Sequence, residues 1–459
     1  MSIKLEHLES LQLSQDQVVT SGSKLLEHGT DWLKIWAGQP SLILFPKSTK
    51  DVLNIVNWAR SYKYPLIPEG GRTGLSGGTL ALKKEILVSF DKMNQLIDFN
   101  PFERTVTVEP GFITQDLQEF AKEKSLYFPI SFAAQGSSQI GGNIATNVGG
   151  VHVIKYGNIK RYVLGLEVVT GKGELLKLGK GLVKNAVGYS LKDLIIGSEG
   201  TLAFITQATL FLVSPPENKQ VFLIAIEKSQ DMLQIYKAFK NQIEILAFEF
   251  FTDLALKHVL KHGGLSSPLN RAPFYLLIEL EGKDSEKALR IFENFYEKNF
   301  VKDGILSQNS KQAQDLWKLR ENISEAISCF KTYKNDVSVR MSKMTDFLQD
   351  LDKLLNHHYP DFEKIVFGHL GDGNLHINIL KPESWEKKNF TKECEKVNNV
   401  LFELIKKYEG SISAEHGIGL LKKDYLFYSC SQEEIAIMKS LKKIFDPDQI
   451  LNPGKIFDL

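Results

Sequence analysis

The sequence predicts an α+β protein built from two domains, and three observations lead to this class. The chain has 459 residues, enough for about three domains of roughly 150 residues, or for two of which one is enlarged. Segments typical of strands and of helices alternate along it, and the alternation restarts after Ser214-Pro215-Pro216. Apolar residues make up 43% and charged residues 24% of the chain, which is the balance of a soluble globular protein.

The first half is expected to hold a mostly helical lead-in at 1–35 and a first domain at 36–215. A helix is predicted to start at Ser48 and to end before Pro65, because apolar residues recur at positions i, i+3, i+4 and i+7. These residues are Val52, Ile55, Val56 and Ala59. Strands are predicted at 65–68, 85–91 and 104–109, and a hairpin over Val163–Leu178 around a Gly-Lys-Gly turn.

The second half is expected to hold a second α+β domain at 216–425 and a C-terminal segment at 426–459 that returns to the first domain. Period-two and period-3.6 patterns again define its elements. Strands are predicted at 221–226, 245–251 and 274–281, and helices at 229–242, 284–298, 312–330, 343–357 and 386–408.

Charge and cysteine counts exclude several classes of protein. With 56 Lys plus Arg against 55 Asp plus Glu, the net charge is +1, so no global field attracts nucleic acid. The three cysteines, Cys329, Cys394 and Cys430, are too far apart for an iron–sulfur cluster. The N-terminus lacks the pattern of a signal peptide, and the uncharged stretch 125–154 is too polar to span a membrane. We expect a cytoplasmic protein, with peripheral attachment to the inner membrane left open.

Three glycine runs are candidates for binding a ligand through the backbone. The first, from Pro68 to Gly78, follows a predicted strand and contains Arg72. Backbone N–H groups of such a run can bind phosphate oxygens, although a flexible surface loop would have the same composition. It matches neither the P-loop nor the GxGxxG pattern. The second run, Gly136 to Gly150, and the third, Gly197 to Thr201, are rich in amide and hydroxyl side chains, as a large dinucleotide requires.

Taken together, five motifs resemble the vanillyl-alcohol-oxidase-type family of FAD-linked oxidases, in the branch of D-lactate dehydrogenase, D-2-hydroxyglutarate dehydrogenase and the flavin-binding subunits of glycolate oxidase. They are PEGGRTGLSGG at 68–78, GSSQIGGNIATNVGG at 136–150, Tyr156-Gly157, the segment Gly188 to Thr206, and LNPGKIF at 451–457. The resemblance covers the chain from about residue 36 to its end. It implies a two-subdomain FAD-binding domain, a ferredoxin-like α+β cap domain and non-covalent FAD.

Residues carried over from the family motifs form the expected cofactor site. They are Pro68, Gly70, Gly71, Arg72, Thr73, Gly74, Leu75, Gly136, Ser137, Gly141, Gly142, Asn143, Gly150, Gly200, Ile205 and Asn452. Two departures affect individual contacts. Relatives often have Pro-Pro-Asp-Pro where this chain has Pro129-Ile-Ser-Phe132, and His152 stands where Arg is common. His152 is also a conceivable covalent tether.

Two histidines flank a predicted hairpin turn. Asp372-Gly373 is typical of a two-residue type I′ turn, which would place His369 directly opposite His376, with Asn378 farther along the same face. Opposed residues have Cβ atoms about 5 Å apart, close enough to share a metal ion. A pair of histidines without a ligand remains the alternative.

A later segment supplies a carboxylate and a third histidine, Glu415 and His416. Glu415 could complete a His-His-Glu metal site with open coordination positions, and His416 could act as a general base. In isolation the segment could equally be a loop that holds both residues by chance. The resemblance implies that His369, His376 and Glu415 bind a divalent metal, Zn or Mn, and that His416 takes the substrate's hydroxyl proton.

Substrate binding is expected on a helix and on the segment after it. Arg320 offers a fork for a carboxylate, and the resemblance favours this over a solvated helix face. Lys334, Ser324 and Asn378 are further candidates. Relatives usually have Val-Pro where this chain has Val339-Arg340, and this added cation either alters substrate choice or faces solvent.

These inferences predict an FAD-dependent dehydrogenase that oxidises a D-2-hydroxy acid, D-lactate or glycolate, to the 2-oxo acid by hydride transfer to flavin. The electron acceptor would be a quinone, a soluble carrier or an iron–sulfur subunit, and the chain could form a homo-oligomer or a hetero-complex. The alternative is a flavin-binding electron-transfer subunit of a glycolate oxidase-like complex that is inactive alone. A sugar or alcohol oxidase of the same fold should lack the histidine and Glu-His set.

Overall fold

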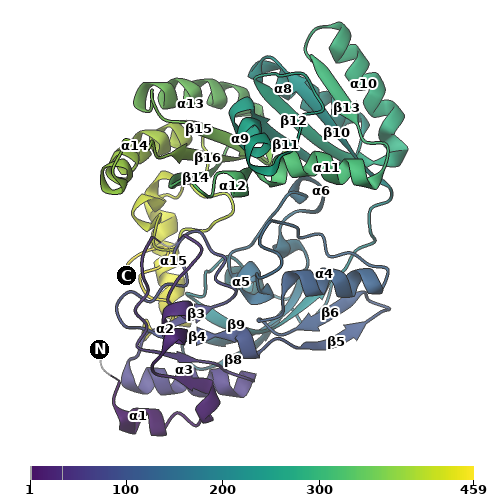
Figure 1. The fold of residues 1–459 in the computed structure, drawn as a ribbon. Coiled ribbons are helices and arrows are strands. Elements are labelled where there is room, and N and C mark those ends of the chain that lie inside the picture. Colours follow the sequence, from purple (N-terminus) through teal and green to yellow (C-terminus); the bar gives the residue numbers. More distant parts are fainter. Residues whose placement is uncertain (1–2, 34) are drawn as a thin grey trace. The chain divides into compact units, whose positions relative to one another are not determined.

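The computed structural model describes residues 3–33 and 35–459, so residues 1, 2 and 34 of the expected lead-in lie outside it. The chain forms two compact units (Figure 1). Unit 1 comprises Met1–Gly149, Asn158–Pro215 and Glu415–Leu459, and unit 2 comprises Gly150–Gly157 and Pro216–Ala414. The chain therefore passes from unit 2 to unit 1 at Glu415, whereas the sequence pattern placed the end of the second domain at residue 425.

Unit 1 contains a four-stranded sheet in the order β1-β2-β4-β3, in which β2, β4 and β3 run parallel. The strands are β1 (Val18–Val19), β2 (Leu42–Leu44), β4 (Ile86–Ser89) and β3 (Leu66–Glu69). Helix α3 (Thr49–Tyr62) packs its apolar side against this sheet, and the Ser48 side chain caps it by accepting the N–H of Asp51. The predicted helix is confirmed. The lead-in contains helices α1 (Leu5–Glu9) and α2 (Ser23–His28), but strand β1 also lies in it.

A second, antiparallel sheet of unit 1 has the order β5-β6-β9-β7-β8. Its strands are β5 (Leu96–Asn100), β6 (Thr105–Val108), β9 (Ala203–Phe211), β7 (Val163–Thr170) and β8 (Leu175–Leu178). Strands β7 and β8 are the predicted hairpin. Helices α4 (Thr114–Glu123) and α5 (Ile140–Ala145) lie beside this sheet in Figure 1, and α7 (Leu191–Ile195) precedes β9. Helix α15 (Gln432–Phe445) begins at the Ser431 cap.

Unit 2 is built on a seven-stranded antiparallel sheet in the order β13-β10-β12-β11-β15-β16-β14. Its first part follows the β-α-β-β-α-β pattern of a ferredoxin-like fold, from β10 (Lys219–Ile226) through α8 (Met232–Gln242), β11 (Ile245–Thr252), β12 (Phe274–Glu281) and α10 (Ser285–Glu297) to β13 (Asp303–Leu306). A second, incomplete set follows: β14 (Thr332–Ser338), α13 (Met344–His358), β15 (Lys364–Gly368), β16 (Asn374–Leu380) and α14 (Lys387–Lys407). The expected α+β class with a ferredoxin-like cap is confirmed.

Three further helices cover one face of the unit 2 sheet, namely α9 (Asp253–Gly263), α11 (Ser310–Glu321) and α12 (Ile323–Ala326). The helix predicted at 312–330 is therefore interrupted at Asn322. The segment Gly150–Gly157, with helix α6 (Val153–Tyr156), also belongs to unit 2 although both of its chain neighbours belong to unit 1. Within the described residues, no helix has both the length and the apolar character needed to cross a membrane.

Candidate active site

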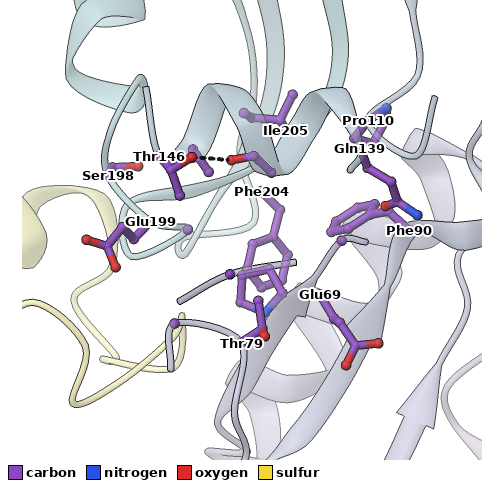
Figure 2. Close-up of a pocket in the computed structure, with 18 of the residues that line it drawn as sticks. Glu69, Thr79, Phe90, Pro110, Gln139, Thr146, Ser198, Glu199, Phe204 and Ile205 are labelled. Atoms are coloured by element: carbon purple, nitrogen blue, oxygen red, sulfur yellow. Dashed lines mark hydrogen bonds between the residues drawn. The ribbon is translucent and has the colours of Figure 1, made fainter. Parts of the chain in front are cut away.

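Residues from all three glycine runs line a single pocket of unit 1, which has a volume of about 800 Å³ including its open mouth (Figure 2). Phe90, Phe204 and Pro110 provide apolar walls, and His416 also lines the pocket. The predicted cofactor residues among the lining are Pro68, Gly70, Gly74, Gly141, Gly142, Gly200 and Ile205.

The other predicted cofactor residues are not among those that line this pocket. They are Gly71, Arg72, Thr73, Leu75, Gly136, Ser137, Asn143, Gly150 and Asn452. Two of them pack closely together, because a side chain at Gly71 would collide with the carbonyl oxygen of Ser137. Gly150 belongs to unit 2. Direct contacts of these nine residues with a cofactor stay predictions.

The pocket has the features that FAD requires. Beside Gly74 and Gly142, no described atom lies within 4 Å of the position that a Cβ would occupy, so a ligand can approach the backbone there. Three buried polar atoms in its lining have no hydrogen-bond partner among the described residues, namely Gln139 Oε1, Ser198 Oγ and Glu69 Oε2. Buried polar atoms are normally satisfied. Hydroxyl groups of FAD could donate to the two acceptor oxygens, and the Ser198 hydroxyl could donate to a phosphate.

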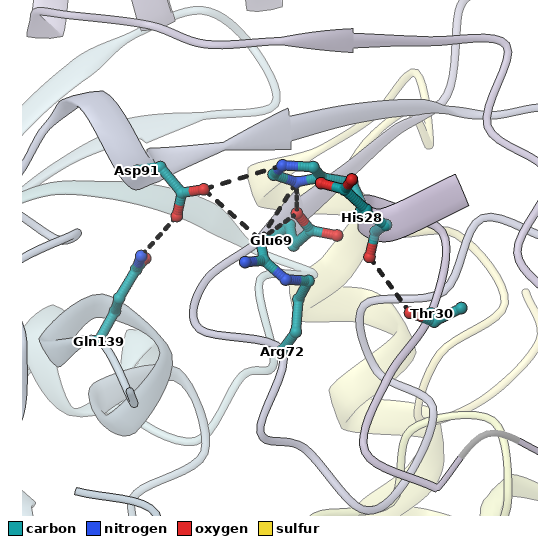
Figure 3. A network of polar contacts seen from close by, with 7 residues as sticks. His28, Thr30, Glu69, Arg72, Asp91 and Gln139 are labelled. Atoms are coloured by element: carbon teal, nitrogen blue, oxygen red, sulfur yellow. Dashed lines mark hydrogen bonds and ion pairs between the residues drawn. The ribbon is translucent and has the colours of Figure 1, made fainter. Parts of the chain in front are cut away.

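A charged network supports the start of the first glycine run (Figure 3). Glu69 accepts a hydrogen bond from His28, and the Nη1 atom of Arg72 lies 3.3 Å from Glu69 Oε1 and 3.5 Å from Asp91 Oδ2. Gln139 donates to Asp91 at 2.7 Å. Burial raises the pKa of Glu69, and the neighbouring His28 and Arg72 act against this rise. The sequence predicts that Arg72 binds a phosphate, whereas in the structure its guanidinium pairs with the carboxylates of Glu69 and Asp91. The sequence analysis assigns no role to either carboxylate.

Glu199 anchors the loop that carries His416. This carboxylate is buried and accepts the backbone N–H groups of Ile418 and Gly419 at 2.7 and 2.8 Å. The Asn452 side chain donates to the Glu199 carbonyl oxygen at 2.7 Å and to that of Gly78 at 3.0 Å. Burial raises the pKa of Glu199, while its two N–H donors lower it. The glycine run 197–201 therefore positions a catalytic candidate as well as the pocket wall, which its sequence motif did not indicate.

The predicted two-residue turn between His369 and His376 is wrong. A 3-10 turn at Leu370–Asp372 and a left-handed Gly373 connect the strands, so His376 pairs with Phe367 and not with His369. Any side chain at Gly373 would collide with the Val339 carbonyl oxygen. This close contact is part of the observed connection, which takes the place of the expected two-residue turn. Because the register differs by two residues and side chains alternate with period two, the histidines still lie together. Their ring centroids are 5.3 Å apart.

A carboxylate lies behind each of these two histidines. Both carboxylate oxygens of Glu249 lie 2.9 Å from Nδ1 of His369, and Asp336 Oδ1 lies 3.6 Å from Nδ1 of His376. Asp336 is itself held by the side chain of Asn374 at 2.8 Å and by the Ala414 N–H at 3.1 Å. Histidines that bind metals typically donate their second ring N–H to a carboxylate or carbonyl, so the pair fits a metal site.

Sequence reasoning missed Glu249 and Asp336. The available signal was a single carboxylate inside an otherwise apolar strand, as at Glu249 between Phe248 and Phe250. Such a residue is buried only with partners, but nothing local identifies them.

The predicted substrate residues differ in position. Arg320 is buried, with Nη2 2.8 Å from Glu249 Oε2 and its guanidinium 4.7 Å from the centre of the Phe367 ring. Apart from this ion pair, Arg320 Nε and Nη2 make no hydrogen bond with the described residues. Lys334 is half-buried opposite Asn378, and burial, with a smaller effect of Lys331, lowers its pKa. The candidate Ser324 is exposed on α12.

Three remaining residues can also be placed. Arg340 is exposed and pairs with Glu409 at 3.3 Å, so this cation faces solvent. His152 is buried in unit 2, where its Nε2 lies 2.6 Å from Glu279 Oε2. Glu415 belongs to unit 1 and the two hairpin histidines to unit 2, so its part in a metal site stays a prediction.

The pocket, the two sheets of unit 1 and the ferredoxin-like unit 2 together define an FAD-dependent oxidoreductase of the vanillyl-alcohol-oxidase type. The family described as FAD binding domain matches residues 40–179, and the family described as FAD linked oxidases, C-terminal domain, matches residues 215–456. The chain belongs to the FAD-linked oxidase family.

Two curated relatives are similar over almost their whole length. The D-2-hydroxyglutarate dehydrogenase of Stutzerimonas stutzeri is 48% identical over 99% of this chain and 98% of its own. The D-2-hydroxyglutarate dehydrogenase of Xanthomonas citri pv. viticola is 46% identical over 96% of this chain and 94% of its own. A solved structure, p-cresol methylhydroxylase with substrate bound, shares the fold with a TM-score of 0.77 at 15% identity, over 99% of this chain and 96% of the other.

These comparisons confirm the family branch, the fold class and FAD as the cofactor. They also confirm the predicted enzyme class, a 2-hydroxyacid dehydrogenase acting on CH–OH donors.

Proposed function

We propose that this chain is an FAD-dependent D-2-hydroxyglutarate dehydrogenase that forms 2-oxoglutarate. This replaces the expectation of D-lactate or glycolate as the substrate. The names of the two relatives support it. The observation that carries it is the buried Arg320 beside the hairpin histidines, because its Nε and Nη2 make no hydrogen bond with the described residues. An Arg fork matches a carboxylate in geometry and charge.

A second cation suits the second carboxylate of 2-hydroxyglutarate. Lys334 lies opposite Asn378, and Asp336 opposite His376, so the register places Lys334 and Asn378 on the same sheet face as His376. Phe367, which packs under Arg320, is also opposite His376. D-lactate and glycolate have one carboxylate each and would leave one of the two cations without a partner. We assign Arg320 and Lys334 to the two carboxylates, with Asn378 as a hydrogen-bond partner and no role for Ser324.

The metal ligands of the proposed site are His369, His376 and Glu415, with Zn or Mn as the metal. The carboxylates behind the two histidines support this set. Glu415 directly follows Ala414 in the chain. The backbone N–H of Ala414 donates a hydrogen bond to Asp336, the carboxylate that lies beside His376. A bound divalent ion would lower the pKa of the substrate hydroxyl.

His416 is the proposed general base. It lines the pocket, and the Glu199 carboxylate holds the two N–H groups that follow it in the loop. A ring nitrogen of His416 would take the hydroxyl proton, which contributes about 10²–10⁴-fold to rate in typical enzymes. FAD, when bound, supplies the acceptor for the hydride that leaves Cα.

Several accompanying assignments are proposals on the same basis. The FAD domain would span 36–215, and the cap would start at 216 and end at Ala414, where the chain returns to unit 1. Electrons would leave to a quinone, a soluble carrier or an iron–sulfur subunit. Peripheral attachment to the inner membrane, and a homo-oligomer or a hetero-complex, are separate proposals. Of the described cysteines, Cys329 is exposed, Cys394 is buried and Cys430 is partly buried, and none is in a disulfide.

Anaerobic flavin reduction tests the substrate. We expect D-2-hydroxyglutarate to bleach the flavin absorption with the largest kcat/KM, ahead of D-lactate, glycolate and L-2-hydroxyglutarate. A chelator should abolish the bleaching, and added Zn²⁺ or Mn²⁺ should restore it. Faster reduction by D-lactate or glycolate would overturn the dicarboxylate assignment, and bleaching that resists the chelator would remove the metal from the proposal.

A further inference from the structure

Glu249 is a fully buried carboxylate in the middle of strand β11, between apolar neighbours. The desolvation of such a charge costs several kcal/mol, so it is stable only with close partners. A well-packed apolar residue at such a position is often no less stable. The contacts that Glu249 makes therefore indicate what it does for the site.

The first contact determines which nitrogen of His369 can bind a metal. Both Glu249 oxygens lie 2.9 Å from Nδ1 of His369, so the carboxylate favours the tautomer with the proton on Nδ1. Metal coordination by a neutral imidazole then requires Nε2. Glu249 fixes both the tautomer and the direction of the ring.

The second contact holds the carboxylate itself. Arg320 Nη2 lies 2.8 Å from Oε2 of Glu249, and both residues are buried. The guanidinium balances the negative charge and restricts rotation of the carboxylate, while its Nε remains without a hydrogen-bond partner among the described residues. Glu249 therefore contacts both Arg320, which is predicted to bind a substrate carboxylate, and His369, which is a predicted metal ligand.

We propose that Glu249 is a positioning residue that presents Nε2 of His369 to the metal and couples this ligand to Arg320. The inference rests on the proposed metal site. It assigns Glu249 no contact with substrate and no proton transfer.

The test compares Glu249→Gln with the unmodified holoenzyme. Bound Zn²⁺ and Mn²⁺ are measured per FAD by mass spectrometry, and metal affinity by competition with a chelator. We expect metal affinity to fall about 10- to 100-fold, as is usual when the partner of a ligand histidine is lost, while the FAD content is unchanged. The d–d absorption bands of the Co²⁺-substituted enzyme should shift or weaken, and Glu249→Asp should recover part of the affinity.

Glu279→Gln is a matched control on the same sheet. Glu279 is also a buried strand glutamate that contacts a histidine and a tryptophan, His152 and Trp317. Its other ion-pair partner is Lys219, and within the described part of the chain it pairs with neither of the hairpin histidines. If this control lowers metal affinity as much as Glu249→Gln, the effect is a general loss of stability and the inference fails.

Measurements on the unmodified protein distinguish failure of the proposed metal site from failure of the positioning role of Glu249. If it binds neither metal while FAD is present, the proposed metal site is wrong, and the inference falls with it. If it binds metal and Glu249→Gln binds it equally tightly with an unchanged Co²⁺ spectrum, the metal site stands and the positioning role is wrong. Should Glu249→Gln fail to fold, Glu249→Asp gives the same readout.

Discussion

Two buried glutamates illustrate how the two units hold their catalytic candidates. In unit 1, Glu199 accepts two backbone N–H groups from the His416 loop. In unit 2, Glu249 contacts two side chains, one cationic and one titratable, Arg320 and His369. The first glutamate positions a loop and the second positions a ring.

The difference shows in how each charge is compensated. Glu199 has neutral donors as its closest partners, and burial raises its pKa despite them. Glu249 has a guanidinium at 2.8 Å, an arrangement in which losing one partner is costly because the other stays buried without compensation. Substitution of Glu199 should therefore act mainly on the geometry of its loop, whereas substitution of Glu249 should act on the two side chains that it contacts.

The largest expected effect is on the rate of the chemical step, with no change in FAD or metal binding. His416→Ala should lower the rate of anaerobic flavin reduction by D-2-hydroxyglutarate about 10²- to 10⁴-fold, because the proposed general base is lost. FAD and metal contents should stay those of the unmodified enzyme. Stopped-flow absorbance measures the rate, and near-normal reduction would remove His416 from the mechanism.

The next effect concerns substrate binding in unit 2. Arg320→Met should lower kcat/KM for D-2-hydroxyglutarate about 10- to 100-fold, since hydrogen bonds to charged groups contribute about 1.5–3 kcal/mol. It should also lower the free energy of unfolding by about 3–5 kcal/mol, because Glu249 loses its cation. Arg340→Met is the control, with an expected change of about 0–1 kcal/mol for an exposed pair. Equal effects of both variants would contradict the carboxylate role.

Glu199→Gln tests the opposite side of the comparison. A glutamine can accept only one of the two loop N–H groups well and presents an NH₂ group to the other. We expect kcat to fall roughly tenfold, equivalent to about 1.4 kcal/mol. Metal affinity should fall less than in Glu249→Gln, because the loop also carries the proposed ligand Glu415. A larger loss of metal affinity than in Glu249→Gln would contradict the separate functions of the two glutamates.

The last effect is a pH dependence of stability in unit 1 and leaves the activity aside. Burial lowers the pKa of Lys455 from 10.5 to about 8, and the negative Glu199 and Glu85 act in the opposite direction. Between pH 8 and 10.5 the unfolded chain holds this proton and the folded chain does not, so stability rises with pH. Relative to Lys455→Met, the unmodified protein should gain at most about 3 kcal/mol over this interval. Urea unfolding at several pH values measures this, and a parallel pH response of both proteins would contradict it.

Much of the fold could be predicted because its signals are local. The spacing of Val52, Ile55 and Val56 defines helix α3, and the Gly171-Lys172-Gly173 turn defines the β7–β8 hairpin. The glycine runs predicted the pocket because glycine lets a ligand come close to the backbone. This property depends on residue type alone.

The parts that could not be predicted depend on distant partners. The turn after His369 differs because Gly373 packs on Val339, which no local pattern contains. Glu249 acquires its role from residues more than 70 positions away, Arg320 and His369. For the same reason the association of Gly150–Gly157 with unit 2, through His152 and Glu279, was not evident from sequence.

Strand β14 is the last strand of the seven-stranded sheet, and this position has a consequence for aggregation. An edge strand exposes main-chain groups that can pair with another molecule, and charged residues on it oppose such aggregation. The strand carries Lys334 and Asp336, and the Ser338–Ser411 bridge shields its end. The charges proposed to serve the site would thus also protect the sheet edge. Replacing Lys334 by an apolar residue would be expected to reduce solubility during folding as well as substrate binding.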